Sequence, residues 1–344
     1  MTGPSVVPSP PVRGAHVASV EIEVDGRVVA VSSPDKPYFP AVGMTKLDLV
    51  QYHLAVADVL LPHCRDRPLN LERYPNGVDG TWFMQKRVPE KRPAWLRTVE
   101  VTFGSGRTAE ELCPASIADV LWAVNIGCIT VHPWSITVHD TQHPDELRVD
   151  LDPQPGVAWD VVRRVTAVVG EVLGEVGLRG HPKTSGSRGM HVVCRIEPEG
   201  YVDVRRAAVA LAREVERRVP DLATSSWWKE ERGDRVFLDY NQNLWDRTMA
   251  CAYAVRAVPD ARVSAPVTWD EVVDVEPEDL TVATMPARLA EVGDLTADLD
   301  EHAGSIDGLL ALAAADDEAG LPDLPLPPHF PKFANEPKRV PPSR

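Results

Sequence analysis

The sequence predicts an α+β fold in which mixed β-sheets are flanked by helices. Short segments that alternate apolar and polar residues, as strands with one buried face do, are interspersed with longer segments whose apolar residues recur at helical spacing. No internal repeat of fixed period is present. With 344 residues, the chain is long enough for one large domain or two closely packed ones.

The first part of the chain predicts both kinds of element. Residues 20–31 predict a hairpin, because the pair Asp25-Gly26 is typical of a type I′ turn. Residues 44–61 predict an amphipathic helix with Thr45 as its N-cap and Pro62 after its end. The further elements expected here are short strands over 82–89 and 95–103, a helix over 116–126 and an apolar strand over 128–132.

The rest of the chain continues the mixture. Its expected elements are a strand that ends near 152, a helix over 159–176, a strand, loop and strand over 179–196, a helix over 202–219, a strand over 236–240 and an extended edge over 264–269. After residue 276 the chain is acidic and is expected to be helical. From residue 321 it is rich in Pro, which predicts an extended tail.

Composition excludes several classes of protein. A hydrophobic content of 44% and a charged content of 25% are typical of a soluble globular chain. No run approaches 18 apolar residues, so we expect no membrane span. The Pro- and Ser-rich start predicts a flexible leader rather than a secretory signal. The five cysteines form no Cys-x-x-Cys pair, which argues against a zinc knuckle and fits core residues in a reducing cytoplasm.

The net charge of −15 taken alone argues against nucleic-acid binding, because phosphates favour a basic surface. Much of the acidic excess, however, lies after residue 270, whereas residues 183–256 are more balanced and carry Arg and Lys near the candidate motifs. The overall charge therefore does not decide the partner.

Three carboxylates stand out. Asp150 and Asp152 lie two apart on a predicted strand that Pro153 ends, so they point to the same side with Cα atoms roughly 6.5–7 Å apart. They would repel each other unless a cation lay between them, and their oxygens suit Mg²⁺ or Mn²⁺. The alternative is a pair of exposed carboxylates on an ordinary strand. Asp239, which would share a strand face with Phe237, needs a partner or a cation of its own.

A second motif, Lys-Thr-Ser-Gly-Ser-Arg-Gly-Met-His over residues 183–191, lies between two predicted strands. Its small residues would let backbone N–H groups approach phosphate oxygens, while Lys183 and Arg188 add charge. The alternative is a solvated hairpin loop, which needs Gly and Ser as well. The spacing is not that of a Walker loop. His132 could orient a phosphate or satisfy a core carbonyl.

Together these motifs resemble the polymerase domain of the bacterial end-joining ligase D proteins, a branch of the archaeo-eukaryotic primase superfamily. The matching stretches, in family order, are Arg67-Pro68, Arg73-Tyr-Pro-Asn-Gly77, Phe83-x-Gln-Lys86, His132-Pro-Trp134, Asp150-Leu-Asp-Pro153, Lys183-Thr-Ser-Gly186 with Gly189-x-His191, Asp239-Tyr-Asn-Gln-Asn243 and Tyr253-x-Val-Arg256. The resemblance implies a primase-type catalytic core within a domain over 16–305. We divide it into an N-terminal part (16–130), a catalytic core (131–270) and an acidic helical part (271–320), between a leader (1–15) and a Pro-rich tail (321–344).

The resemblance also implies roles for individual residues. Asp150, Asp152 and Asp239 would hold two Mn²⁺ or Mg²⁺ ions for two-metal catalysis on a nucleoside triphosphate. Contacts with the nucleotide are implied for His132, Ser185, Arg188, His191, Gln242 and Arg256, and a contact with nucleotide or template for Arg232. Trp82 and Phe83 would pack on bases, with core packing as the alternative. Lys36 and Lys46 would hold a downstream 5′-phosphate, with ordinary surface lysines as the alternative.

The implied function is template-directed addition of ribo- or deoxyribonucleotides to a primer 3′-OH at gapped, nicked or broken DNA during repair. A separate ligase and Ku are candidate partners, no membrane is expected, and the implied location is the cytoplasm at the nucleoid. The Lys-x-Asp-Gly nucleophile motif of the ligase is absent, so we expect a stand-alone polymerase. Arg188 and Met190 depart from the Lys and Leu common in the family, and Tyr240 could shape the sugar pocket. Two alternatives stay open: a metal-dependent nuclease or phosphohydrolase in which His132 or His191 activates water, and an inactive DNA-end binding module.

Overall fold

The computed structural model describes residues 5–8, 19–103 and 106–327, which include two five-stranded sheets. The first sheet has the order β10-β6-β9-β8, with β7 paired to β6, and every pair is antiparallel. Its strands are β6 (Leu69–Arg73), β7 (Phe83–Gln85), β8 (Thr98–Thr102), β9 (Thr108–Leu112) and β10 (Cys128–Pro133).

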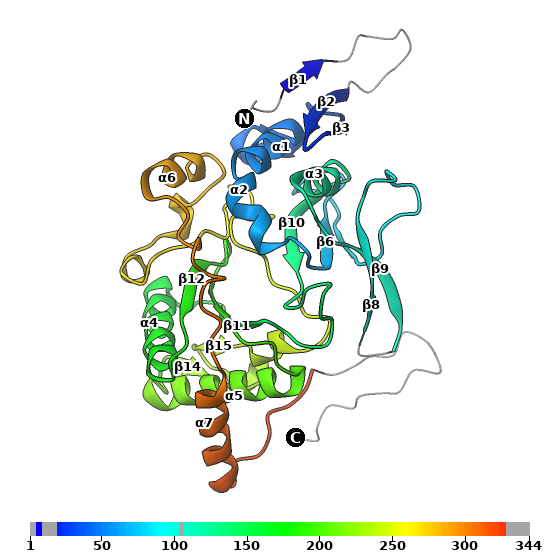
Figure 1. Ribbon diagram of the computed structural model, residues 1–344. Helices are drawn as coiled ribbons and strands as arrows, with labels where there is room; N and C mark the ends of the chain where they lie inside the picture. Colours follow the sequence, from blue (N-terminus) through cyan, green and yellow to red (C-terminus); the bar gives the residue numbers. More distant parts are fainter. Residues whose placement is uncertain (1–4, 9–18, 104–105, 328–344) are drawn as a thin grey trace.

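The second sheet has the order β12-β13-β11-β15-β14, and its pairs are antiparallel except for β14 with β15. Its strands are β11 (Glu146–Pro153), β12 (Gly180–Thr184), β13 (Met190–Arg195), β14 (Ala223–Thr224) and β15 (Val236–Leu238). The central strand β11 contacts α4 (Trp159–Glu175) and α5 (Tyr201–Arg218), which lie beside this sheet in Figure 1. The apolar residues of α4 recur at helical spacing and are buried there, as the sequence predicted.

Smaller elements complete the described chain. At the end of the molecule opposite α4 and α5 (Figure 1) lie β1 (Ser5–Pro8), β2 (Ser19–Val24), β3 (Arg27–Ser32), α1 (Lys46–Ala55), α2 (Ala57–Leu60) and α3 (Ile117–Asn125). The others are β4 (Pro37–Phe39), β5 (Met44–Thr45), α6 (Met285–Val292), α7 (Asp307–Glu318) and short 3₁₀ helices η1 (Pro40–Val42), η2 (Leu61–His63), η3 (Lys229–Glu231), η4 (Tyr240–Asn243), η5 (Glu271–Val273) and η6 (Pro277–Asp279).

Several local predictions are confirmed. The first hairpin turns at Asp25 and Gly26, whose φ angles of 53° and 67° are those a type I′ turn requires. Thr45 caps α1 in a capping box with Asp48. The five cysteines are buried and free. In the described part of the chain, no helix has the length and apolar character needed to cross a bilayer.

Other predictions are wrong in detail. The helix expected over 44–61 is interrupted at Val56, and Pro62 lies inside η2 rather than after the helix. Part of the expected leader, Ser5–Pro8, is a strand paired with β2. Strands β6 and β9 were not predicted. The edge over 264–269 is held beside β12 by a single bridge from Pro266 to Lys183 rather than by a full strand.

The C-terminal part was expected to be helical throughout. Among the described residues after 276, α6 and α7 are the α-helices, and residues 321–327 form neither helix nor strand. The remainder of the predicted Pro-rich tail, 328–344, lies outside the described residues.

Candidate active site

The second sheet brings the three predicted carboxylates together. Strand β15 pairs with the end of β11, so that Leu238 lies opposite Leu151. The strand then stops, and the backbone N–H of Asp239 donates to the carbonyl oxygen of Asp150 at 2.9 Å. Asp239 was expected to lie on a strand and share a face with Phe237. In the structure it is instead the N-cap of η4. It still lies directly beside the pair on β11.

The electrostatics of this cluster favour a bound cation. Burial, together with the charges of Asp239 and Asp152, raises the pKa of Asp150 to about 7. Burial also raises the pKa of Asp239. Carboxylates whose ionisation is opposed by burial, and to a lesser extent by each other's charge, are stabilised in their charged form by a cation such as Mg²⁺ or Mn²⁺. In the described ranges no group of three or more His, Cys, Asp or Glu side chains is already arranged to hold a metal ion.

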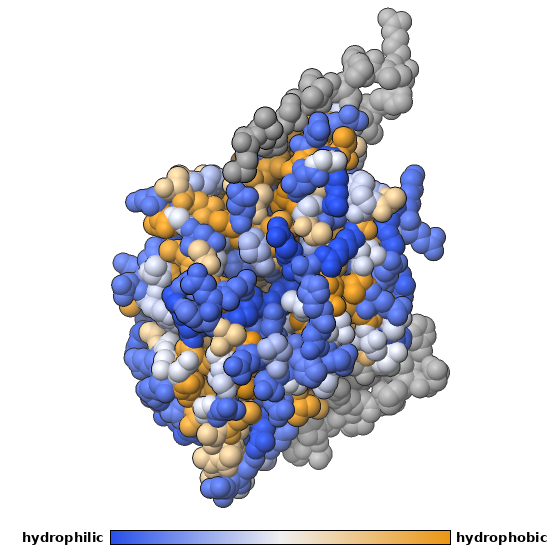
Figure 2. Space-filling model, in the orientation of Figure 1, coloured by the Kyte–Doolittle hydropathy of each residue, from blue (hydrophilic) through white to orange (hydrophobic). Residues whose placement is uncertain are grey.

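A polar hollow opens beside these carboxylates and collects most of the predicted nucleotide contacts. Its lining includes Asp150 and Asp152, and it also includes His132, Ser185, Arg188, His191, Gln242 and Arg256. The amide of Gln242 donates to Asp150 Oδ2 at 3.0 Å. Figure 2 shows hydrophilic residues gathered across the middle of one face of the molecule. The sequence thus predicted a set of residues that the fold does bring to one place.

Arg232 lies at the margin of this site. Its side chain is buried against Phe237, with the guanidinium carbon 3.6 Å from the ring centroid. One guanidinium nitrogen is 4.0 Å from Asp152 Oδ2. Arg232 therefore lies beside Asp152, a carboxylate that itself lines the hollow. Tyr240 is buried among Trp227 and Phe237, and its suggested part in shaping a sugar pocket stays a prediction.

The loop over 183–191 uses its small residues differently from the expectation. Ser185 Oγ accepts hydrogen bonds from the backbone N–H groups of Ser187 and Gly189, each at 3.1 Å, so these donors are engaged within the loop. Gly189 is required by a close approach to β11, because a Cβ atom there would lie 2.1 Å from the carbonyl oxygen of Leu151. Arg188 is exposed and adds its charge to the wall of the hollow.

Lys183 turns inward from this loop. Its ammonium donates to His191 Nδ1 and Ser264 Oγ, both at 2.6 Å, and to the carbonyl oxygen of Ala250 at 2.8 Å. Burial lowers the pKa of Lys183 to about 7. Burial and the charge of Lys183 also lower the pKa of His191 well below its usual range, so the imidazole is neutral. With Nδ1 accepting, the His191 proton lies on Nε2, which is 3.6 Å from Asp150 Oδ1.

His132 has a partner that the sequence did not reveal. Its Nε2 lies 2.8 Å from Glu72 Oε2, and the hydroxyl of Tyr74 donates to the other oxygen of Glu72 at 3.0 Å. Burial alone would raise the pKa of Glu72, but the hydrogen bond and charge of His132 lower it to about 2. His132 therefore satisfies a carboxylate rather than a core carbonyl. Glu72 lies on β6, an unpredicted strand, and its only signal was its place beside Arg73.

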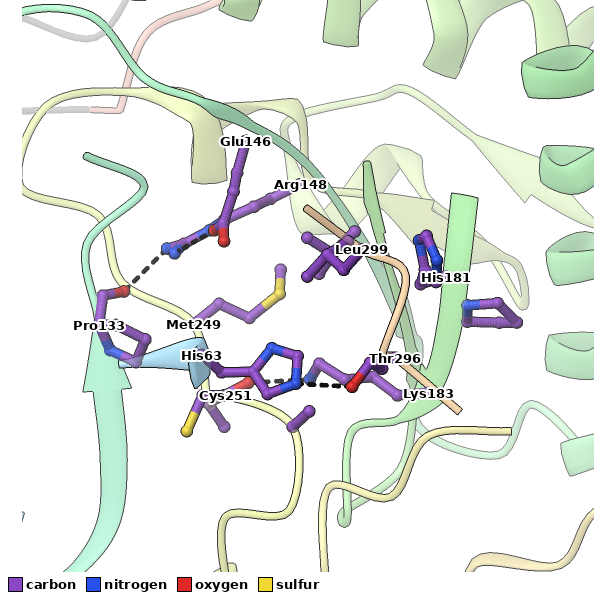
Figure 3. A pocket seen from close by; sticks show the side chains of 14 residues that line it. His63, Pro133, Glu146, Arg148, His181, Lys183, Met249, Cys251, Thr296 and Leu299 are labelled. Carbon is purple, nitrogen blue, oxygen red and sulfur yellow. Dashed lines mark hydrogen bonds and ion pairs between the residues drawn. The ribbon is translucent and has the colours of Figure 1, made fainter. Parts of the chain in front are cut away.

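A second cavity is lined by residues of β11 and β12, among them Lys183, and by His63 and Thr296 (Figure 3). Glu146 and Arg148 of β11 also line it, and their side chains are 2.6 Å apart at their closest atoms. Arg67 and Arg195 approach Glu146 to 3.5 and 3.2 Å. Strand β11 is therefore buried on both faces along this half, whereas one buried face was expected.

The predicted DNA contacts fall into two groups. Trp82 and Phe83 are 56% and 45% exposed at β7, so the alternative of core packing is wrong. The ring of Trp82 stacks on Tyr74 at 6.1 Å between centroids, and the guanidinium of Arg73 lies 5.2 Å from the ring of Phe83. Exposed aromatic rings with a neighbouring cation form a surface on which bases can stack.

Lys36 and Lys46 are not ordinary surface lysines. Lys36 Nζ donates to the carbonyl oxygen of Pro75 at 2.6 Å and to Asn76 Oδ1 at 2.8 Å. Lys46 is only 4% exposed, and its Nζ donates to the carbonyl oxygen of Asn125 at 2.8 Å. Burial and the charge of Lys36 lower the pKa of Lys46 to about 8. Both cations are thus held by protein acceptors at the N-terminal end of the molecule.

Comparison with known proteins identifies this arrangement. Residues 45–296 match the family described as "LigD, primase-polymerase domain". The chain is 32% identical over 315 residues to the multifunctional non-homologous end joining protein LigD of Mycolicibacterium smegmatis, which covers 91% of this chain and 41% of that protein. It is 30% identical over 302 residues to the LigD of Pseudomonas aeruginosa, covering 85% of this chain and 35% of that protein.

A solved structure agrees with the sequence matches. The polymerase domain from Mycobacterium tuberculosis ligase D, in complex with DNA, superposes with a TM-score of 0.75 at 31% identity, covering 80% of this chain and 99% of that domain. The predicted primase-type α+β fold is thereby confirmed. The chain spans about two fifths of the length of the first of these relatives.

Proposed function

The chain belongs to the LigD primase-polymerase family, and we propose that it extends a primer 3′-OH with nucleotides chosen by a template at DNA gaps and breaks. The observation that carries this proposal is the convergence of Asp150, Asp152 and Asp239 beside a hollow lined with nucleotide-binding residue types. Family membership makes the enzyme a nucleotidyltransferase, and the site is where that chemistry would take place.

Asp150, Asp152 and Asp239 would hold the divalent ions. Two such ions would lower the pKa of the primer 3′-OH and neutralise the charge of the triphosphate and the leaving pyrophosphate. The other groups act directly on the substrate. Arg188 and Arg256 would neutralise phosphate oxygens, and the neutral His191 would donate from Nε2 to one of them. Ser185, whose Oγ lone pairs accept from the loop, keeps its O–H proton free to donate.

Two pairs of residues outside the hollow would bind DNA. Trp82 and Phe83 would stack on bases, which tolerates any sequence and suits a polymerase. Lys36 and Lys46 would hold a downstream 5′-phosphate, which requires the phosphate to replace acceptors such as Asn76 Oδ1. We propose a separate ligase and Ku as partners, and the cytoplasm at the nucleoid as the place of action.

Extension of a gapped duplex with Mn²⁺ or Mg²⁺ tests the function. Reactions with ribo- and deoxyribonucleoside triphosphates, with and without a 5′-phosphate at the gap, report activity, sugar preference and the role of the two lysines together. We expect template-directed extension that Asp239→Ala abolishes while DNA binding persists. Shortening of the primer without triphosphate would instead support a nuclease. DNA binding without extension in either metal would support an inactive end-binding module.

A further inference from the structure

The segment that follows α7 runs back beside α5 (Figure 1) and reaches η4, the short helix that Asp239 caps. The carbonyl oxygen of Pro322 accepts from Arg213 of α5. Asp323 Oδ1 and the carbonyl oxygen of Leu324 then accept from Arg205, at 3.3 and 2.6 Å. The carbonyl oxygen of Pro325 accepts from the amide of Asn241 at 3.2 Å. We call Asp323–Pro325 the C-terminal strap; it lies beyond residues 45–296, which the family match covers.

Two buried residues connect the strap to a catalytic carboxylate. Arg205 is 6% exposed and donates from Nε to Asn241 Oδ1 at 2.9 Å. Asn241 is 1% exposed, and its backbone N–H donates to Asp239 Oδ1 at 3.0 Å. One residue of η4 therefore holds the catalytic carboxylate with its backbone and is itself held by α5 and the strap through its side chain.

The backbone of Asp239 is held by its own hydrogen bond to Asp150, but the orientation of its carboxylate depends on Asn241 and the contacts of Asn241, because η4 is only four residues long. A 3₁₀ helix of this length has few and poorly aligned internal hydrogen bonds. Its far end is fixed to β11 by Asn243, whose side chain donates to the carbonyl oxygen of Arg148 at 2.8 Å. At the end that carries Asp239, the side-chain partners of Asn241 are Arg205 and the strap.

We propose that the C-terminal strap, Arg205 and Asn241 form one positioning unit for Asp239 and thereby set the affinity of the site for its divalent cations. The unit touches neither substrate nor metal. It rests on the proposed function in one respect, that Asp239 is a metal ligand. Mutation of a residue that orients a metal-ligating side chain typically lowers metal affinity or activity by 10- to 100-fold.

The test compares the full chain with three variants. Shortening the chain to end at Pro322 removes the strap and retains α7. Arg205→Met removes the guanidinium that donates to both Asn241 and the strap, and it leaves the direct contact of Asn241 with Pro325 in place. Arg206→Met is the matched control, because Arg206 is the next residue on α5 and pairs with Asp317 of α7 without a described contact to Asn241. Mn²⁺ affinity without substrate, measured by electron paramagnetic resonance, is the main readout, beside primer extension and thermal unfolding.

We expect the shortened chain and Arg205→Met to bind Mn²⁺ at least 10-fold more weakly and to regain extension at high Mn²⁺, while Arg206→Met matches the wild type. Wild-type Mn²⁺ affinity in a folded shortened chain or in Arg205→Met would overturn the proposal, as would an equal loss in Arg206→Met. If the shortened chain does not fold, full-length Arg205→Lys decides, because one ammonium cannot serve Asn241 and the strap with the geometry of a guanidinium.

The same titration separates this proposal from the function on which it rests. A wild-type protein that binds Mn²⁺ but never extends a primer would refute the polymerase function and leave the strap to be judged on Mn²⁺ affinity alone. A wild-type protein that extends a primer but has no measurable Mn²⁺ affinity without substrate would refute the role of the strap and leave the polymerase function standing.

Discussion

Replacing Lys183 by Met should make the protein more stable at neutral pH and less active. The side chain of Lys183 is buried, and its ammonium donates to His191, Ser264 and Ala250. Met has a similar length and no charge, so it fills the same space. Met cannot donate to His191 Nδ1, however. The variant therefore no longer favours the tautomer in which the His191 proton lies on Nε2, the nitrogen that faces Asp150.

The size of the stability effect follows from the pKa of Lys183, which burial lowers from 10.5 to about 7. Each pKa unit corresponds to about 1.4 kcal/mol, so at pH 7 and below the buried charge costs about 5 kcal/mol. The three lost hydrogen bonds offset this by about 1 kcal/mol each. The variant should thus gain about 2 kcal/mol at pH 7. Between pH 7 and 10.5 the folded protein binds fewer protons than the unfolded chain, so wild-type stability rises with pH through this window and the advantage of Met disappears.

Urea unfolding of both proteins at pH 7 and pH 9.5 measures this change. The difference in unfolding free energy should move by about 3 kcal/mol in favour of the wild type, because 2.5 pH units of the window are crossed. Lys91→Met, at an exposed lysine, is the control and should show no such dependence. Primer extension by Lys183→Met should fall at least 10-fold. A variant that is less stable at pH 7 by an amount independent of pH would refute the reasoning.

Three further outcomes are expected. Burial raises the pKa of Glu111 to about 8, so Glu111→Gln should gain about 3 kcal/mol of stability at pH 7 and little at pH 4, which urea unfolding at the two pH values checks. Gly189→Ala should abolish extension and lower the melting temperature, because its Cβ would overlap Leu151. Gly174→Ala is the control: its Cβ meets no described heavy atom within 4 Å, so it should leave extension unchanged and add stability. Trp82→Ala should weaken binding of primer–template at least several-fold without changing the melting temperature, since the ring is 56% exposed; unchanged affinity in a fluorescence anisotropy titration would remove Trp82 from the DNA surface.

Part of the acidic excess after residue 270 pairs with arginines of α5 and β13. Asp316 lies against Arg213 and Arg217, and Asp300 against Arg195. The carboxylates of this part thus neutralise cations of α5 and β13. A strongly negative net charge in this chain therefore does not describe the surface at the active site, which has Arg188 and Arg256 in its lining.

Local structure was predictable wherever a few neighbouring residues decide it. The positive φ angles at Asp25 and Gly26 and the capping box at Thr45 depend on contacts within four residues. The alternation that ends at Asp152 likewise placed two carboxylates on one side of a strand end. Ordered motifs added the family, and with it the expectation that Asp239 joins them.

The sequence by itself determined which residue types carry the chemistry and in what order they occur along the chain. Only the tertiary structure decided which of these side chains are charged and which hydrogen-bond partners orient them. Glu72 beside His132, Lys183 beside His191 and Asn241 beside Arg205 are all encounters between different elements. Their protonation and orientation depend on burial and on partners distant in sequence, and a pattern read along one chain carries neither.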